Sequence, residues 1–553
     1  MLKQSLEKEL DKYKEEIELN PDNPLPYFHI GNILLEERNL EDAIFIYKMS
    51  LEKDPKNAGV YNNIGTAYAM EQKYFNAINY FKKAVKHDPE FKDALINLAS
   101  AFTSSAQTEK AIKIYEKAIK KYPENITVAE NLYHLKRQNA DWKNLPKIKN
   151  WNEPFINVIY DENLKSNLDV AKKFSKSFEL QNKKYKFNKK KKGKLNIGYV
   201  SAHFHNHPTG HLISSLFEYH DKSKFNIYIY CLGPNDFSSY YGKIKKSATK
   251  FRDLYNVNFS ESADQIYKDK IDILIDLDGY TDNNRLLLFA KKIAPIQITY
   301  LGFPGTLGTK FVNYILTDKV VTPKSYQKYF TEKFIYLPNS YQVNDDSLEI
   351  SEINYKRKDF KLPLNKFIFA SFNGTYKIEP EVFGIWMNIL KKVPESILWL
   401  YKNNKVAEKN LKNEAKKRGI DPKRLIFAKR LSREKHLKRL SLADLSLDTF
   451  ICNGHTTTSD SLWANVPVVT KIGKHFASRV AASILTAAGF PELITKTPKE
   501  YEELIIKIAK DPELLKSLKD KLEENKTTKS YFDTQKFTRN LEEVYINLWQ
   551  KGF

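Results

Sequence analysis

The stretch LSLDTFICNGHTTTSDSLWANVPVV, from Leu445 to Val469, shows the strand–helix–strand order that is typical of an α/β protein. It passes from an apolar strand through a turn to a run of hydroxyl-bearing residues, and it ends in a Val-Pro-Val-Val strand. Gly454 permits a tight turn, Thr456 to Ser459 supply N-cap hydroxyls, and the segment from Asp460 predicts a short helix. A helix that begins among hydroxyls is a natural binding place for an anion.

Short apolar strands alternate with helical stretches throughout the chain beyond Leu195, and a second series begins after about Pro363. This alternation is typical of parallel sheets covered by helices, so the two series predict two α/β domains. Ligands of such domain pairs usually lie in the cleft between them. The expected strands are LNIGYVSAHF, FNIYIYCLG, IDILIDLDGY, IQITYLGFPG and NYILTD in the first series, and FIFASFNG, SILWLYKN, RLIFAKR, LSLDTFICNG and VPVVTK in the second.

The N-terminal part contains a repeat of 34 residues, with three full copies and a partial fourth near residues 126–137. Its markers are Pro21, Pro55, Pro89 and Pro123 at the repeat ends, Ala43, Ala77 and Ala111 inside, and Gly31, Gly65 and Ala99 where a small residue lets helices approach. This is the tetratricopeptide pattern of paired helices stacked into a superhelix. The concave face of such a superhelix binds an extended peptide or a partner; a helical spacer for oligomerisation is the alternative.

Length and composition indicate a globular protein. The 553 residues suggest about three folding units of roughly 150 residues each, and no run approaches the ~18 apolar residues of a membrane span. The N-terminal residues lack the apolar core of a signal peptide. Only two cysteines are present, Cys231 and Cys452, so we expect no disulfide framework and a cytoplasmic location.

The formal net charge is +23, from 90 Lys and Arg against 67 Asp and Glu. A basic chain raises nucleic acid as a partner. The excess is mostly lysine spread through predicted helices, without zinc-finger spacing or an arginine-rich arm, so we expect no nucleic-acid partner. The densest patch, Lys183 to Lys194, predicts a solvated linker.

The second α/β series carries groups that could hold a nucleoside diphosphate. Lys377 supplies a point charge for phosphate, and Thr456 and Thr457 would donate together with helix amides. Asp460 would accept from ribose hydroxyls. Taken singly, each residue also fits a cap or a solvated face, but their joint presence favours the binding site. Three basic residues share one side of a predicted helix by their three-residue spacing, namely Arg433, His436 and Arg439.

The first series offers weaker signals. Four histidines lie close together, at His203, His205, His207 and His211. Their spacing gives no tetrahedral set, so zinc is a minority interpretation. Asp276 and Asp278 could hold a metal-nucleotide complex, although carboxylates are common at strand ends. The loop LGFPGTLG, residues 301–308, would let backbone amides approach a sugar.

These residues resemble the tetratricopeptide-containing O-linked N-acetylglucosamine transferases, including bacterial SPINDLY-like members. The resemblance covers nearly the whole chain and follows the family order in IGYVSAHFHNHPTGHL, DILIDLDGYTDNNRLLLFAKKIAPIQITYLGFPGT, FNGTYKI, ESILWL, LSLDTFICNGHTTTSDSLWANVPVV and ASRVAASILTAAGFPEL. It implies a GT-B fold of two Rossmann-like halves and a UDP-sugar donor. It also implies transfer to a Ser or Thr hydroxyl with inversion at the anomeric carbon, and no metal.

The resemblance also implies roles for individual residues. His436 would stack on uracil, Asp460 would contact ribose, and Lys377, Thr456 and Thr457 would cradle the diphosphate, with Arg433 and Arg439 nearby. His207 matches a histidine near the reacting centre, proposed as the general base. The positions that would line the sugar are Gly302, Pro304, Tyr376, Cys452 and His455.

The chain departs from the family pattern in four places. Gly374 stands where glutamine is frequent, and Arg433 replaces a lysine. Tyr267 stands where animal members carry a second histidine, so the base assignment stays open and Asp264 is a further candidate. The region Asn344 to Lys361 is short, so the large inserted domain of animal members is absent.

We therefore expect an α-helical tetratricopeptide superhelix followed by a GT-B glycosyltransferase that acts on polypeptides in the cytoplasm with UDP-N-acetylglucosamine. The donor serves as a co-substrate, and no cofactor is expected. GDP-fucose or UDP-glucose are alternative donors, and a scaffold with an inactive transferase half is the alternative class. The repeats would hold the acceptor polypeptide or form a homodimer. The expected domains are residues 1–140 for the repeats, 141–193 for a helical and lysine-rich linker, 194–345 for the acceptor-side catalytic domain, and 346–553 for the UDP-sugar domain with C-terminal helices.

Overall fold

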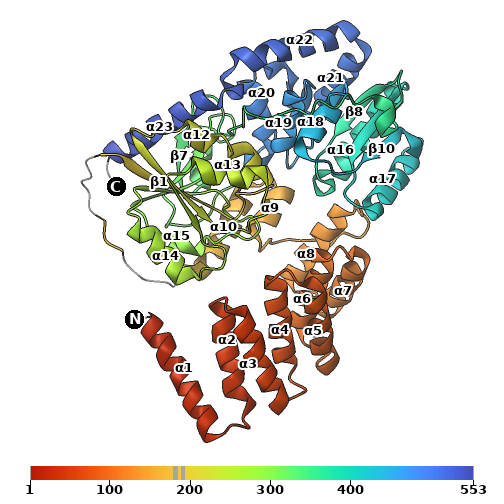
Figure 1. The fold of residues 1–553 in the computed structure, drawn as a ribbon. Coiled ribbons are helices and arrows are strands. Elements are labelled where there is room, and N and C mark those ends of the chain that lie inside the picture. The colour runs from red at the N-terminus through yellow and green to blue at the C-terminus, as the bar shows by residue number, and fades with distance from the viewer. Residues whose placement is uncertain (1, 179–184, 188–192, 552–553) are drawn as a thin grey trace. The chain divides into compact units, whose positions relative to one another are not determined.

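The structure is a computed structural model that describes residues 2–178, 185–187 and 193–551 (Figure 1). The predicted linker patch from Lys183 to Lys194 lies mostly outside these residues. The chain divides into two compact units. The first unit comprises Met1–Lys136, Leu145–Lys149 and Asn256–Phe259, and the second comprises Arg137–Asn144, Asn150–Tyr255 and Ser260–Phe553.

The first unit is built from helices that pair as the 34-residue repeat predicts. A Cβ on Gly31 would lie 2.5 Å from the Tyr47 ring, and a Cβ on Gly65 would lie 2.7 Å from the Phe81 ring. The small residues therefore do let the paired helices approach, as predicted. The helices are α1 (Leu2–Leu19), α2 (Pro24–Glu36), α3 (Leu40–Lys53), α4 (Ala58–Met70), α5 (Tyr74–His87), α6 (Lys92–Ser104), α7 (Thr108–Lys121) and α8 (Ile126–Gln138), of which α8 ends in the second unit.

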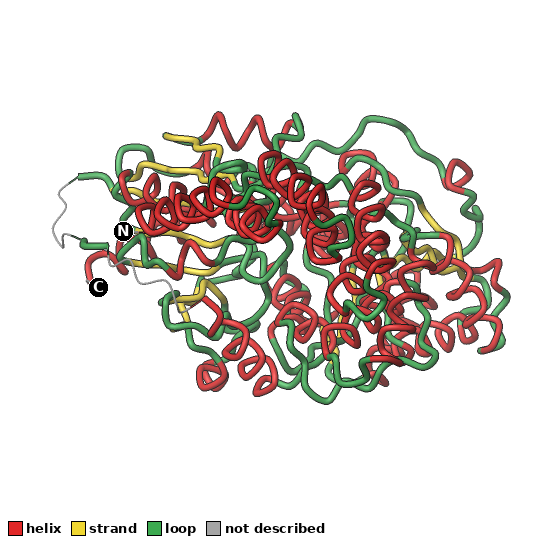
Figure 2. Tube along the Cα trace, turned by 90° about the horizontal axis from the view of Figure 1, so that it is seen from below, coloured by secondary structure: helices red, strands yellow, loops and turns green. Residues whose placement is uncertain are grey.

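The second unit contains two parallel sheets, whose strands form separate groups in Figure 2. The first sheet has the order β3-β2-β1-β4-β5-β6-β7. Its strands are β1 (Leu195–Ser201), β2 (Phe225–Cys231), β3 (Lys250–Asp253), β4 (Ile273–Asp276), β5 (Ile296–Thr299), β6 (Tyr314–Thr317) and β7 (Lys333–Tyr336). Its helices are α11 (Pro208–Ile213), α12 (Leu216–Tyr219), α13 (Ser239–Ser247), α14 (Phe259–Lys268) and α15 (Leu287–Ala290), and α9 (Pro154–Tyr160) and α10 (Leu164–Ser175) precede them.

The second sheet has the order β10-β9-β8-β11-β12-β13. Its strands are β8 (Phe367–Ser371), β9 (Ser396–Tyr401), β10 (Leu425–Ala428), β11 (Leu445–Leu447), β12 (Val468–Lys471) and β13 (Ile494–Thr495). Its helices are α16 (Pro380–Lys392), α17 (Lys405–Lys417), α18 (Arg433–Leu440), α19 (Thr456–Trp463), α20 (Val480–Ala487), α21 (Pro498–Lys510), α22 (Pro512–Thr528) and α23 (Thr534–Lys551). The connection between the sheets holds one short 3-10 turn, Arg357–Phe360.

Both sheets have the doubly wound order, which reverses between β1 and β4 and again between β8 and β11. This confirms the predicted fold class. All ten predicted strands are present, whereas β3, β7 and β13 were not predicted. These three lie at sheet edges and are short, and β3 and β7 are partly exposed, so none forms a continuous apolar run.

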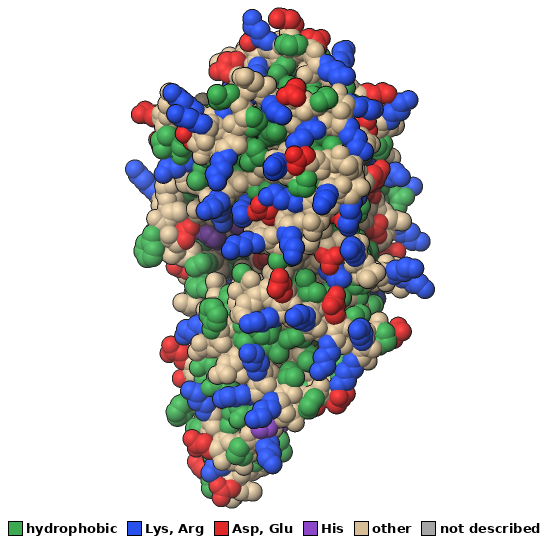
Figure 3. All heavy atoms as spheres, turned by 90° about the vertical axis from the view of Figure 1, so that its right-hand side faces the viewer, with side chains coloured by type: hydrophobic (Ala, Val, Ile, Leu, Met, Phe, Trp, Pro, Cys, Tyr) green, Lys and Arg blue, Asp and Glu red, His purple; other side chains and the backbone are tan. Residues whose placement is uncertain are grey.

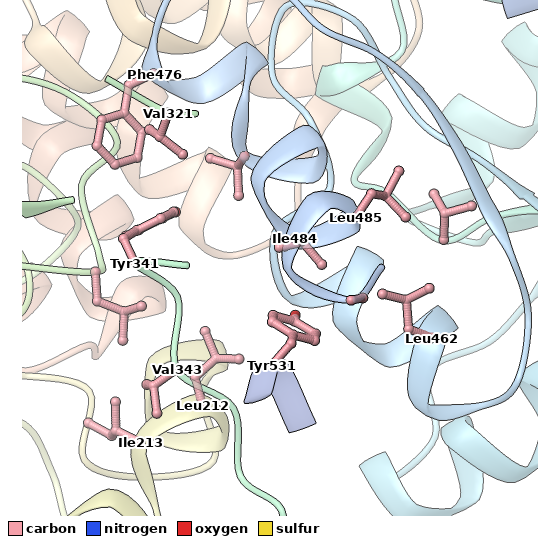
Figure 4. Close-up of a cluster of buried hydrophobic side chains, with 14 of the residues drawn as sticks. Leu212, Ile213, Val321, Tyr341, Val343, Leu462, Phe476, Ile484, Leu485 and Tyr531 are labelled. Carbon is pink, nitrogen blue, oxygen red and sulfur yellow. The ribbon is translucent and has the colours of Figure 1, made fainter. Parts of the chain in front are cut away.

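The half built on β1–β7, called the first half, is joined to the half built on β8–β13, called the second half, by a continuous apolar cluster. Figure 4 shows part of it, with Leu212 and Val343 on one side, Leu462 and Ile484 on the other, and Tyr531 between them. All five side chains are buried. Such an area of apolar contact stabilises one arrangement of the two halves.

The last helix, α23, extends from the second half back to the first. Tyr545 OH lies 3.0 Å from Tyr199 OH, and His220 Nδ1 lies 3.1 Å from Glu542 Oε1. All four side chains are buried. Because buried polar groups are costly unless paired, these contacts specify where the helix returns.

The surface agrees with a scattered charge excess. Figure 3 shows Lys and Arg side chains spread over the visible face and interspersed with acidic ones. Among the helices of residues 2–178 and 193–551, none is long and apolar enough to cross a membrane.

The close contact at Gly65 makes a prediction about stability. Gly65→Leu should destabilise the first unit by about 1–3 kcal/mol, because the added side chain overlaps the Phe81 ring although leucine favours helices. Urea unfolding followed by far-UV circular dichroism measures the effect. Gly242→Ala, in α13, is the matched control, since its new Cβ would meet nothing within 4 Å. Equal midpoints for Gly65→Leu and the unmodified chain would contradict this packing.

Candidate active site

The predicted residues of the second half gather at the carboxyl edge of its sheet, where the strand order reverses. Lys377 lies in the loop after β8, and residues 452–460 follow β11. Loops at such a switch point diverge to the two faces of the sheet and leave a crevice for a ligand. A small pocket here is lined by Asn373, Asp448 and Thr457, among others.

Asp448, directly after β11, holds the turn that leads into α19. Its Oδ1 accepts a hydrogen bond from Gly454 N at 2.6 Å, and its Oδ2 accepts one from Thr470 Oγ1 at 2.6 Å. Burial raises the pKa of this carboxyl group to about 6. A Cβ on Gly454 would lie 2.5 Å from Thr457 Oγ1, so a larger residue in this turn would displace the Thr457 hydroxyl.

Helix α19 begins at Thr456 rather than at Asp460, and the predicted N-cap role of the hydroxyls is wrong. The N-cap position is His455, which makes no side-chain cap bond. Thr458 Oγ1 instead donates back to Gly454 O at 2.8 Å, because a hydroxyl inside a helix bonds the preceding turn. Within the described part of the chain, no hydrogen bond uses the amides of Thr456 and Thr457. These amides are available to an anion.

Lys377 approaches the same turn from the loop after β8. Its Nζ donates to Asn453 O at 2.7 Å. Burial disfavours its charge, but nearby groups, Cys452 foremost, outweigh burial and raise the pKa of Lys377. Thr457 Oγ1 donates to Asn373 Oδ1 at 2.8 Å and ties the two loops together. A cation therefore lies close to an uncapped helix start, which suits a phosphate group.

Tyr376 lies directly before Lys377 and is fixed by its neighbours. A Cβ on Gly374 would lie 2.7 Å from the Tyr376 ring, so the ring occupies the space that a glutamine at this position would need. The carbonyl of Tyr376 accepts from Arg137 Nη2 at 3.0 Å. Tyr376, which is predicted to line the sugar, is thus fixed both at its ring and at its carbonyl.

Cys452 and His455, two of the positions predicted to line the sugar, lie in the turn before α19. Cys452 has a free, buried thiol, and burial raises its pKa. Burial, with a smaller contribution from Lys377, lowers the pKa of His455 to about 3. Its Nε2 is buried without a hydrogen-bond partner among the described residues. A buried polar atom of this kind indicates a place for a ligand or water.

Helix α18 carries the three basic residues, but they have different partners. Arg439 Nε donates to His436 Nδ1 at 3.1 Å, and its guanidinium lies 5.0 Å from the Phe372 ring centroid. Because Nδ1 accepts, neutral His436 carries its proton on Nε2, and burial lowers its pKa to about 4. Arg433 instead forms a buried ion pair with Asp460, with Nη2 2.8 Å from Oδ1.

In the first half, the loop after β5 packs closely against its neighbours. A Cβ on Gly302 would lie 2.1 Å from Leu277 O, so only glycine fits against the loop after β4. Pro304 is buried in the same loop. The buried carboxylate of Glu332 accepts from Leu307 N at 2.7 Å and fixes the far end.

His207 caps helix α11 in this structure. Its Nδ1 accepts from Thr209 N at 3.2 Å, and its ring stacks on His203 with centroids 3.9 Å apart. Burial, followed by the neighbouring His203, lowers the pKa of His207 to about 2. The lone pair on Nδ1 is therefore engaged, and the neutral ring carries its proton on Nε2. His207 can accept a proton on Nδ1 only after releasing Thr209 N.

Asp276 and Asp278 shape the loops around them. Asp278 accepts from Ser201 Oγ at 2.5 Å and from Ala202 N at 2.7 Å, and Asp276 accepts from Gly279 N at 3.0 Å. Burial raises the pKa of both carboxyl groups to about 7. In the described residues no cluster of three or more His, Cys, Asp or Glu could hold a metal.

Tyr267 and Asp264 lie away from the other predicted residues. Both are on α14, where their hydroxyl and carboxylate bond residues 185–187. Asn196, at the start of β1, donates to carbonyls just after α14 at 3.0 and 3.2 Å. His207 follows the opposite end of β1. The structure therefore separates the two proposed alternatives to His207 from it by the length of a strand.

Sequence reasoning missed residues that shape the site through hydrogen bonds. Asp448 had a local signal, since a carboxylate follows an apolar strand. Glu332 had none, because its partners Thr306 and Leu307 lie far away in the sequence.

The chain is similar to known proteins over both halves. The model of Glycosyl transferase family 41 matches residues 166–356 and 347–541, and a tetratricopeptide repeat model matches residues 68–133. The chain is 39% identical over 362 residues to "Probable UDP-N-acetylglucosamine--peptide N-acetylglucosaminyltransferase SEC" of Arabidopsis thaliana, with 64% of this chain and 37% of that protein covered. It is 29% identical over 470 residues to the Caenorhabditis elegans UDP-N-acetylglucosamine--peptide N-acetylglucosaminyltransferase, with 65% and 41% covered. The chain thus spans about two fifths of the length of these curated relatives.

A solved structure shares the fold. A mutant of the Thermobaculum terrenum O-GlcNAc transferase superposes with a TM-score of 0.72 at 23% identity, over 96% of this chain and 98% of that one. The resemblance stated from sequence motifs is confirmed. Because the family model matches more than half of the residues and extends across both sheets, the chain belongs to glycosyltransferase family 41.

Proposed function

We propose that the protein transfers N-acetylglucosamine from UDP-N-acetylglucosamine to serine or threonine hydroxyls of a polypeptide. The observation that carries the proposal is the meeting of Lys377 with the open amides of Thr456 and Thr457 at a sheet switch point. The names of the two curated relatives favour this donor over GDP-fucose or UDP-glucose, and this activity over an inactive scaffold.

In the proposed reaction the leaving group is UDP. The acceptor oxygen forms a bond to the anomeric carbon from the face opposite the diphosphate, and the bond from that carbon to the phosphate oxygen breaks. Negative charge grows on the diphosphate, where Lys377 and the first amides of α19 would stabilise it. Asp460 would contact the ribose, and His436 would stack on the base. These charges take the place of a metal, and we expect none.

The proton of the acceptor hydroxyl must leave during this step. His207 is one candidate base, and its bond from Thr209 N would have to break first. The donor's own phosphate is the other candidate. The sugar itself would lie against Gly302, Pro304, Tyr376, Cys452 and His455.

The first unit would bind the acceptor polypeptide. Amide side chains form a hydrogen-bonded series from helix to helix, in which Asn63 Nδ2 donates to Asn32 Oδ1 at 2.8 Å and Asn97 Nδ2 donates to Asn62 Oδ1 at 2.9 Å. An amide side chain offers both a donor and an acceptor, which matches the backbone of an extended peptide. A homodimer through these helices is the competing use. We propose a reducing cytoplasm as the location, because both cysteines are free and buried.

Replacement of Lys377 tests the donor site. Lys377→Ala should lower the transfer rate by about 100-fold or more, because the departing diphosphate loses its cation. Calorimetric titration with UDP, GDP and their sugar conjugates should show UDP binding that is weakened in the variant. Incorporation of labelled N-acetylglucosamine into lysate proteins measures transfer.

Lys392→Ala is the matched control, because Lys392 is exposed in the same half and pairs with Glu502 at 2.7 Å. It should retain binding and transfer. Preferential binding of GDP-fucose would contradict the donor assignment. Nucleotide binding that Lys377→Ala leaves unchanged would contradict the proposed place of the diphosphate.

His436 makes a prediction about pH. Its pKa is lowered to about 4 by burial, so the unfolded chain binds the extra proton between about pH 6.5 and pH 4. The contribution of His436 to stability is therefore constant above pH 6.5 and is lost as pH falls through this window. The Tm of His436→Asn, measured by thermal unfolding, should rise relative to the Tm of the unmodified chain as pH falls from 6.5 to 4.5. A difference in Tm that stays constant over this range would contradict an imidazole that folding keeps neutral.

A further inference from the structure

Arg433, the first residue of α18, uses all three of its guanidinium nitrogens in protein contacts. Its Nη2 and Nε donate to Asp460 Oδ1 at 2.8 and 3.3 Å, and its Nη1 donates to His211 O at 3.0 Å. The side chain is 4% exposed. These bonds use three of the five N–H donors of the guanidinium, so protein partners set its orientation. The structure therefore gives Arg433 two protein partners, Asp460 and the carbonyl of His211.

The two partners of Arg433 belong to different halves. His211 is in the last turn of α11, whose carbonyls have no partner within the helix and attract a cation. The same helix begins at His207, its N-cap. Asp460 is in α19, whose first turn carries the proposed diphosphate site. One guanidinium therefore links the helix of the candidate base to the helix of the leaving group.

Two contacts hold the His211 side chain at the end of α11. The His211 Nε2 atom lies 2.8 Å from Asn206 Oδ1, and its ring packs on Tyr240 with centroids 4.5 Å apart. Because the His211 side chain is held in this way, a displacement of Arg433 would shift the end of α11 together with this side chain.

Asp460 retains one oxygen for a ligand. Both bonds from Arg433 end on Oδ1, and no hydrogen bond among the described residues uses Oδ2. The ion pair with Arg433 holds the carboxylate in one orientation. The ribose hydroxyls of the donor would bind Oδ2 while Arg433 holds Oδ1.

We propose that Arg433 is a positioning residue that couples donor binding at Asp460 to the placement of α11, and so of His207. The inference rests on the proposed function, since it requires a nucleotide on Asp460. Coupling of this kind is reciprocal: a nucleotide that fixes Asp460 and Arg433 also orders α11.

A purely structural role is the alternative. Buried ion pairs are weak contributors to net stability, yet removal of one partner is strongly destabilising. Loss of stability in a variant therefore does not separate the two roles. The amide exchange of α11 with and without UDP separates the two roles. A structural defect alters exchange in both conditions, whereas a loss of coupling alters only the response to UDP.

The experiment is hydrogen–deuterium exchange of the full chain, with and without saturating UDP. In the unmodified chain UDP should slow exchange in residues 209–213 by roughly tenfold, a coupling of ordinary size. Arg433→Lys keeps the charge but loses the planar fork whose separate nitrogens reach Asp460 and the His211 carbonyl. It should bind UDP at least about fivefold more weakly and lose the UDP-dependent slowing even at saturation.

Arg357→Lys is the matched control. Arg357 also pairs with a carboxylate, Asp444 at 2.9 and 3.0 Å, and with the carbonyl of Leu364, but both partners lie within the second half. This variant should retain UDP affinity and the slowing in α11. Asp460→Asn provides a second test if Arg433→Lys does not fold, and it should also lose the slowing.

The outcomes separate the two proposals. UDP-dependent slowing that persists in both Arg433→Lys and Asp460→Asn overturns the coupling while the donor site stands. Loss of slowing in Arg357→Lys also overturns it, since the effect would not be specific to the link between halves. An unmodified chain that binds no UDP contradicts the proposed function itself, and the coupling with it.

Discussion

The hydrogen bond from Gly454 N to Asp448 Oδ1, 2.6 Å long and buried, determines the turn that carries most of the candidate site. The second oxygen of Asp448 accepts a hydrogen bond from Thr470, so the carboxylate ties the end of β11 to β12. Together the two bonds fix the backbone conformation that leads into α19. That conformation leaves the first helix amides uncapped and puts Asn453 O within reach of Lys377. The positive end of a helix and a cation thus meet because one buried acid fixes the backbone between them.

The fold holds the first half in a fixed position relative to this turn in the second half. Each half is a doubly wound sheet, and a doubly wound sheet has a crevice only where its strand order reverses. The apolar cluster between the halves and the return of α23 to Tyr199 hold the two sheets together. Arg433 adds a polar link between α11 and α19 in the same region. The proposed reaction, between a donor in the second half and an acceptor from the first, needs such a fixed separation.

The sequence predicts the elements whose pattern is local. The buried strands have apolar runs, and the Gly31 and Gly65 positions recur with the repeat, so both were found from the sequence. The edge strands β3, β7 and β13 lack such runs and were missed. The start of α19 was predicted at Asp460, but the helix begins at Thr456. Hydroxyl residues are common both at N-caps and in a first helical turn, where they donate to preceding carbonyls as Thr458 does. The sequence does not distinguish the two. Tyr267 and Asp264 were proposed from family position, and only the fold shows that α14 ends at the opposite edge of the sheet from His207.

We propose that the start of α19 and Lys377 together bind a nucleoside diphosphate. A crystal structure of the full chain with UDP tests it most directly. The account predicts diphosphate oxygens on the amides of Thr456 and Thr457 with Lys377 Nζ beside them, and a ribose hydroxyl on Asp460 Oδ2. Arg433 should remain on Asp460 Oδ1 and His211 O. Electron density for the nucleotide at another place, or a diphosphate held by Arg433 with Asp460 released, would contradict the account.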